Sequence, residues 1–253
     1  MSHGSEYPGF FARFYDVIYK HVRSDEDSEY FLTKIRECKG PVLEVGVGTG
    51  RFFIEALDKG ADIYGIDISP SMINILQSKL SKSEHHRIEV QDLCKLELHR
   101  SFDLIVAPFR VFMHLTTIQQ QFEALDAVFR HLKPGGTFIF DLFVPNFKML
   151  ADGLNNVKDF DGEYAPGKKL VRFTSMHTDI SKQINYVAFK FIWKEGDTEH
   201  SKTWNTEMRY FFRYEIEHLI NQSELILEAI HGDFKENELT KDSKEFIVVC
   251  KKP

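Results

Sequence analysis

Apolar and polar positions repeat with two different periods along this 253-residue chain. Up to about residue 144, apolar runs of the length of buried strands alternate with stretches that have helical spacing. From about residue 170 to 212 the period is two, which indicates antiparallel strands with one covered face. We therefore predict a parallel α/β unit followed by an antiparallel insertion.

Seven apolar runs suit the strands of one sheet: 42–45, 63–66, 87–90, 102–106, 137–144, 225–230 and 246–250. Apolar residues at helical spacing predict helices at 10–19, 28–37, 51–59, 69–79, 117–132 and 214–221. Lys-Pro-Gly-Gly at 133–136 predicts a turn before the fifth strand. The predicted fold class is α/β, a Rossmann-like doubly wound seven-stranded sheet with a small antiparallel β insertion after the fifth strand.

Residues 41–67 form the most informative stretch, because strand, glycine turn, helix, strand and acid follow one another as in a βαβ unit. Gly46, Gly48 and Gly50 let a ligand approach the backbone closely. Asp67 ends the second strand and can accept hydrogen bonds from a ribose diol. The unit thus predicts a nucleoside-containing ligand at the carboxyl ends of the strands.

Two features decide between a dinucleotide and S-adenosylmethionine (SAM). The glycine spacing is G-x-G-x-G, and Arg51 takes the place of a third dinucleotide glycine. Glu44 lies two residues before the first glycine, where a carboxylate opposes a pyrophosphate and favours a cationic ligand. SAM carries a sulfonium and an ammonium and no phosphate. A nicotinamide oxidoreductase is the alternative that these features disfavour.

Glu44 with E-V-G-V-G-T-G, the strand ending in Asp67, and L-K-P-G-G before the fifth strand resemble the motifs of class I SAM-dependent methyltransferases. The resemblance implies SAM as cofactor and S-adenosylhomocysteine as product. Glu44 and the three glycines would hold the methionine part, Asp67 the ribose and Asp92 the adenine. A capping or turn aspartate is the alternative interpretation of Asp92. The other predicted cofactor-binding residues are Tyr15, Ile68, Met72, Leu93, Ala107 and Phe109.

Two short motifs narrow the resemblance. E-Y-P-G-F-F-A-R-F-Y-D near the N-terminus and F-R-V-F-M-H-L after the fourth strand, together with the insertion carrying Arg172, are similar to N-methyltransferases of nucleotide-linked amino sugars. The general plan is also similar to glycine and sarcosine N-methyltransferases. The resemblance implies that Tyr7 and His114 face the substrate amine and act in catalysis, and that Arg172 binds substrate.

Other interpretations remain open at this point. His114 has an ordinary pKa near 6.5, which suits proton removal at neutral pH, but it could instead fill the loop or cap a helix. The aromatic helix at 10–19 either packs on the core or forms a lid over the cofactor. The predicted activity is SAM-dependent methyl transfer to a small molecule, at an amine nitrogen. Methyl transfer to oxygen or carbon and a non-catalytic SAM-binding protein are the alternatives.

Composition limits the partners. Hydrophobic residues make up 43% and charged residues 28% of the chain, and its net charge of −6 argues against a nucleic-acid binder. The three cysteines are far apart in sequence, which predicts free thiols, and the histidines show no metal-ligand spacing. With no apolar run near the roughly 18 residues of a membrane span, we expect a cytoplasmic protein with no metal and no membrane partner. A homodimer is allowed by the sequence but not indicated by it.

We expect residues 1–253 to form a single methyltransferase domain with four parts. They are an N-terminal helical lid at 1–39, a SAM-binding core at 40–144, an antiparallel insertion on the acceptor side at 145–212, and a last helix with a terminal strand pair at 213–253.

Overall fold

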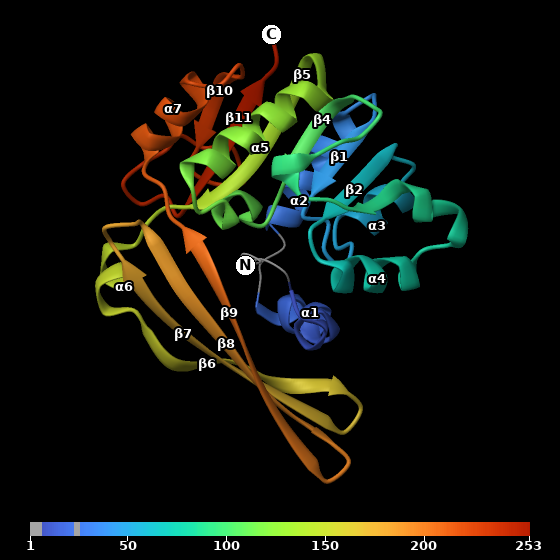
Figure 1. Ribbon diagram of the computed structural model, residues 1–253, viewed down its shortest axis with the longest axis vertical. Helices are drawn as coiled ribbons and strands as arrows, with labels where there is room; N and C mark the ends of the chain where they lie inside the picture. The colour runs from blue at the N-terminus through green and yellow to red at the C-terminus, as the bar shows by residue number, and fades with distance from the viewer. Residues whose placement is uncertain (1–6, 23–25) are drawn as a thin grey trace.

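The computed structural model describes residues 7–22 and 26–253, and its larger part is a seven-stranded sheet (Figure 1). The strands lie in the order β10-β11-β5-β4-β1-β2-β3. They span β1 Val42–Val45, β2 Ile63–Asp67, β3 Ile88–Val90, β4 Phe102–Ala107, β5 Leu132–Phe143, β10 Ile226–His231 and β11 Glu245–Lys251. All neighbours are parallel except β11, which runs antiparallel to β5 and β10. The predicted doubly wound α/β fold is confirmed.

Helices cover both faces of this sheet, which explains why its strands read as continuous apolar runs. One face packs on α2 (Glu26–Glu37), α3 (Phe53–Asp58) and α4 (Pro70–Lys79). The other packs on α5 (Ile118–His131) and α7 (Arg213–Asn221). The four residues of β1 are all buried, and alternate side chains enter the two separate cores.

A second, four-stranded antiparallel sheet follows β5 and the short helix α6 (Phe147–Asp152). Its order is that of the chain: β6 (Leu154–Ala165), β7 (Lys168–Asp179), β8 (Ile184–Glu195) and β9 (Thr198–Arg209). Helix α1 (Gly9–Val22) lies between the two sheets (Figure 1). Its apolar face and one face of the second sheet form an aromatic core that includes Phe11, Phe14, Phe191, Trp193 and Trp204.

Three local predictions differ from the structure. Neither β6 nor α6 was predicted, because Phe160 is the one fully buried residue along β6 and the apolar alternation is missing. Each of the four strands of the insertion has 12 residues. Residues 133–136 belong to β5 and form no separate turn; there the pairing with β4 jumps from Leu132 to Thr137, so the extra residues bulge out of the ladder.

Short 3₁₀ helices η1 (Lys82–Arg87), η2 (Leu93–Lys95) and η3 (Val111–His114) follow α4, β3 and β4. The last two begin just beyond strand ends and so bring loop side chains to the edge of the sheet. None of the helices within 7–22 and 26–253 combines the length and the apolarity needed to cross a membrane. Residues 1–6 and 23–25 of the predicted lid lie outside the described part of the chain.

Candidate active site

The carboxyl ends of β1 to β4 meet at one edge of the sheet, and a cavity of about 460 Å³ opens there. This is where open parallel sheets bind their ligands. Eleven of the predicted site residues line it: Tyr7, Tyr15, Gly46, Gly48, Asp67, Ile68, Met72, Asp92, Leu93, Phe109 and His114. Residues predicted separately along the chain are therefore brought together by the fold.

Different structural reasons favour glycine at Gly46 and Gly48, the first two glycines of the turn. Both have left-handed backbones, with φ of 70° at Gly46 and 55° at Gly48. A Cβ on Gly46 would lie 2.3 Å from a methyl carbon of Val111, so this position is closed by protein. A Cβ on Gly48 would meet no described atom closer than 3.9 Å, and Gly48 lines the cavity. Gly48 therefore leaves room for a ligand.

Asp67 holds the glycine turn in place. Its carboxylate accepts hydrogen bonds from the backbone N–H groups of Gly48, at 2.9 Å, and Ser69, at 2.8 Å. Burial raises the pKa of Asp67 to about 6, while the two N–H bonds oppose that shift. The same carboxylate therefore joins the glycine turn to the start of α4.

Glu44 adds a second buried carboxylate beside Asp67. Its side chain is 2% exposed, and Oε2 has no hydrogen-bond partner within the described chain. Burial, followed by repulsion from Asp67, raises the pKa of Glu44 well above its usual range. Two adjacent carboxylates that are costly to ionise favour a ligand carrying positive charge. This donor set fits the sulfonium and ammonium of SAM.

Asp92 serves as a cap and also lines the cavity. It precedes η2 and accepts a hydrogen bond from the backbone N–H of Cys94 at 3.0 Å. The capping interpretation of this residue is thus correct, and its place in the cavity wall keeps the predicted adenine contact open.

A second cavity, of about 290 Å³, adjoins the first and shares Tyr7, Phe109 and His114 with it. Its wall is mostly aromatic and joins the two sheets. The ring centroids of Tyr7 and Trp204 are 4.5 Å apart, and those of Tyr19 and Phe109 are 5.2 Å apart. The other lining residues are Arg110, Phe189, Thr206 and Met208.

His114 ends η3 at the junction of the two cavities. Thr206 Oγ1 of β9 lies 3.5 Å from its Nδ1, and the Tyr7 ring centroid is 6.4 Å from that of the imidazole. Burial lowers the pKa of His114 to about 4. This shift from the ordinary value near 6.5 favours the neutral imidazole at neutral pH and makes it a weaker proton acceptor.

Four predicted residues lie outside both cavity walls. Glu44 is covered as described above, and Ala107 is fully buried at the end of β4. A Cβ on Gly50 would come within 2.4 Å of Leu76, so this glycine permits close packing of α4.

Arg172, the fourth of these residues, lies behind the aromatic wall of the second cavity. It donates two hydrogen bonds to Asp159, of 3.0 and 2.9 Å. Its guanidinium carbon is 5.3 Å from the ring centroid of Tyr19 and 5.0 Å from that of Phe189. The buried side chain supports these rings.

Sequence reasoning missed several wall residues. The first cavity also includes Val45, Ile66, Gln91, Cys94, Lys95, Val111, Leu115 and Gln120. Val45 and Ile66 end predicted strands and Gln91 follows one, so the predicted strands could have indicated these three. In the second cavity, Tyr19 belongs to the aromatic run of α1. Phe189 and Trp204 lie opposite each other on β8 and β9, but the sequence does not show which sheet face is covered.

Helix α1 is joined to the cofactor-side turn by polar contacts. Thr49 of the glycine turn and Lys79 of α4 both donate hydrogen bonds to the carboxylate of Asp16, at 2.5 and 2.6 Å. Ser69 Oγ donates to the backbone carbonyl of Tyr7 at 3.0 Å. The packing role expected for this helix is present, and its role as a lid stays a prediction.

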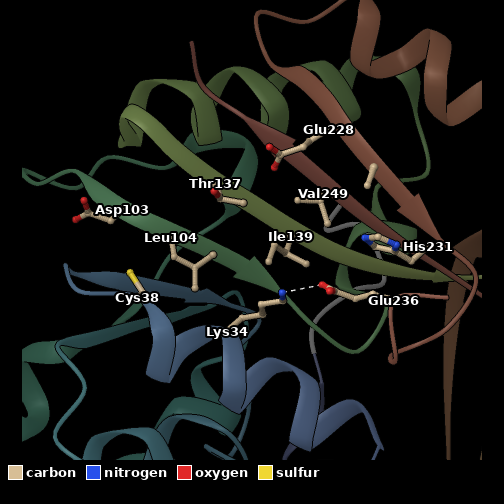
Figure 2. Close-up of a pocket in the computed structure, with 11 residues that line it drawn as sticks. Lys34, Cys38, Asp103, Leu104, Thr137, Ile139, Glu228, His231, Glu236 and Val249 are labelled. Carbon is tan, nitrogen blue, oxygen red and sulfur yellow. Dashed lines mark ion pairs between the residues drawn. The ribbon is translucent and has the colours of Figure 1, made fainter. Parts of the chain in front are cut away.

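A separate hollow of about 450 Å³ lies over β4, β5, β10 and β11 (Figure 2). An ion pair of 2.7 Å between Lys34 and Glu236 crosses it, as Figure 2 shows. Asp103 and Thr137 place it toward the amino ends of β4 and β5, away from the edge where such sheets bind ligands. Among the described residues, no three His, Cys, Asp or Glu side chains are arranged to hold a metal ion.

Residues 42–136 match the family model of the methyltransferase domain. Over 250 residues the chain is 27% identical to a putative methyltransferase, YqeM, of Bacillus subtilis (strain 168), covering 97% of each chain. A glycine/sarcosine N-methyltransferase of Parasynechococcus marenigrum (strain WH8102) is 25% identical over 184 residues, covering 71% of this chain and 63% of the relative.

Among solved structures, a SAM-dependent methyltransferase from Clostridium acetobutylicum ATCC 824 superposes with a TM-score of 0.78 at 20% identity. The match covers 96% of this chain and 97% of that one, so the fold that the two proteins share includes both sheets. The family model thus identifies residues 42–136 as a methyltransferase domain, and the similarity to the full-length relative extends over nearly the whole chain.

Proposed function

We propose that this enzyme methylates an amine nitrogen of a small-molecule acceptor. The observation that carries the proposal is the position of His114 and Tyr7 in the wall shared by the two cavities. In this assignment the 460 Å³ cavity holds SAM and the 290 Å³ cavity holds the acceptor. When bound, SAM supplies a methyl group on a positively charged sulfur.

The first cavity offers polar, charged and apolar contacts for different parts of SAM. Asp67 would accept from the ribose hydroxyls while it holds the turn through Gly48. A cationic ligand would favour the ionised forms of Glu44 and Asp67 near the turn, and Asp92 lines the part of the wall beyond β3. Ile68, Met72 and Leu93 add apolar surface for the nucleoside.

The second cavity suits a small neutral amine. Among its described lining residues there is no carboxylate to pair with an ammonium, and Arg110 adds a positively charged side chain. An amine must be neutral to attack, because its lone pair forms the new bond. A neutral imidazole at position 114 can accept a hydrogen bond from that amine and orient the lone pair. The similarity to a glycine/sarcosine N-methyltransferase supports nitrogen as the methylated atom.

The decisive experiment is a screen of metabolite extracts for S-adenosylhomocysteine formation, with SAM carrying a ¹³C-labelled methyl group. The carbon chemical shift of the product methyl distinguishes a nitrogen-bound from an oxygen-bound or carbon-bound group. We expect a new N-methyl resonance. An O-methyl or C-methyl product would overturn the choice of nitrogen, and SAM binding without turnover on any fraction would favour a non-catalytic SAM-binding protein.

SAM affinity is expected to rise between pH 5 and pH 7. Without ligand, the pKa of Asp67 in the folded protein is raised to about 6. The protonated side chain therefore contributes stability to the fold below about pH 4, and this contribution is lost as the pH rises through 6 and the carboxyl group ionises. A cationic ligand favours the ionised form, so binding below pH 6 must release a proton. About a tenfold gain in affinity corresponds to the ionisation of one such group across this range.

Calorimetry at pH 5, 6 and 7, in buffers of different ionisation enthalpy, measures both the affinity and the released protons. Asp67→Asn keeps a side-chain acceptor but cannot ionise, so it should flatten the profile. Equal affinity at pH 5 and pH 7 with no proton release would contradict the assignment of cationic ligand to these carboxylates.

A further inference from the structure

Two consecutive residues between β4 and η3 have left-handed backbones. The φ angles are 68° at Phe109 and 63° at Arg110, and neither residue is glycine. Side chains disfavour this region because Cβ crowds the following carbonyl oxygen. Such a pair persists only when surrounding contacts hold it, and such segments cluster at functional sites.

Two acidic residues far away in sequence make those contacts. The backbone N–H of Arg110 donates to Asp141 Oδ1 at 3.3 Å, and its guanidinium Nη2 donates to Glu245 Oε1 at 2.7 Å. Asp141 lies near the end of β5 with 1% of its surface exposed, and Glu245 begins β11. The antiparallel register that pairs Asp141 with Ile247 and Glu245 with Phe143 brings both acids to the same edge of the sheet.

The segment they hold lies at the boundary between the two cavities. Phe109 lines both, Arg110 lines only the second, and Val111 lines only the first. The Phe109 ring centroid is 6.2 Å from that of Tyr15 and 5.2 Å from that of Tyr19, so its place depends on the backbone conformation beneath it. If the segment relaxed to right-handed angles, the aromatic boundary between the cavities would move.

We propose that Asp141 and Glu245 are positioning residues that hold Phe109 and Arg110 left-handed before SAM binds. The acids act through Arg110 and need not touch either ligand. They form the boundary between the cavities before SAM binds. The binding free energy of SAM is then not reduced by the free energy needed to bring this segment into its left-handed conformation. The inference rests on the proposed location of SAM in the first cavity.

The test exploits the freedom of glycine to adopt this backbone. Glu245→Ala removes the ion pair and should weaken SAM binding by about tenfold, the scale of one left-handed residue. In that background, Arg110→Gly should return the affinity to within about threefold of the unmutated protein, since glycine adopts a φ near 63° at little cost. Arg110→Ala in the same background should stay weak, although it removes the same side chain.

Calorimetric titration with SAM gives the affinities, and hydrogen exchange of amides 109–111 gives a measurement without ligand. Protection of these amides should be lost in Glu245→Ala and recovered in the glycine double variant but not the alanine one. Glu228→Ala, on β10 and outside both cavities, is the matched control, with its side chain 52% exposed. Where Glu245→Ala fails to fold, Glu245→Gln replaces it in all combinations.

Equal SAM affinity of the glycine and alanine double variants, or an unchanged affinity of Glu245→Ala, would overturn the proposal. A lack of SAM binding by the unmutated protein would overturn the proposed cofactor site instead. The exchange rates of amides 109–111 would then decide by themselves whether the two acids hold this segment.

Discussion

Replacing His114 with alanine is expected to lower kcat on the true acceptor by about 10²-fold, the lower end of the range for general acid–base groups. The imidazole lies where the two cavities meet, and burial keeps it neutral. With a pKa of about 4 it accepts a proton weakly, so its larger contribution is to orient the neutral amine. SAM affinity should change by less than about threefold, because Asp67 and the glycine turn are untouched.

The pH dependence separates orientation from proton removal. In the unmutated enzyme the rate should fall at acid pH as the amine becomes protonated, well above the imidazole pKa of about 4. The rate of His114→Ala should fall over the same acid pH range, from a lower maximum. His218→Ala, at an exposed histidine of α7, is the matched control. Full activity of His114→Ala across pH 6 to 9 would show that the residue only fills the loop.

Gly48→Val is expected to abolish measurable SAM binding, raising Kd by more than about 100-fold, as an obstructed site would. The branched side chain would project into the cavity, since no described atom lies within 3.9 Å of the added Cβ. The left-handed φ of 55° adds a backbone cost that any β-branched residue would incur. Calorimetric titration with SAM measures the loss, and circular dichroism checks that the fold persists.

A matched control separates these two causes. Gly60 has a φ of 84° and nothing within 4 Å of a Cβ, but it follows α3 and lies outside the cavity. Gly60→Val should therefore destabilise the protein through its backbone and leave SAM affinity unchanged. If Gly48→Val binds SAM as tightly as the unmutated protein, SAM does not occupy the first cavity.

Much of the parallel sheet could be predicted from local pattern. β1, β2 and β4 are almost wholly buried, so their residues are mainly apolar, and β1 is followed by Gly46 while β2 ends on Asp67. Helix α4 starts where Ser69 accepts a hydrogen bond from the Met72 N–H and Pro70 takes the first helical position, in agreement with the helix predicted at 69–79. Strand β6 was missed because half of its residues are exposed, only Phe160 is buried, and the apolar alternation is missing.

The sequence by itself determined the geometry of the proposed SAM site. Glu44, the glycine turn and Asp67 belong to one βαβ unit, so their relative positions follow from local chain geometry. The proposed acceptor cavity depended on tertiary structure, because its wall combines α1, η3, β8 and β9. The same holds for two other features. Burial sets the His114 pKa, and pairing of β5 with β11 brings Asp141 and Glu245 to Arg110 across 31 and 135 residues of chain. Contacts between such distant segments form only when the chain is packed, and short-range pattern does not encode them.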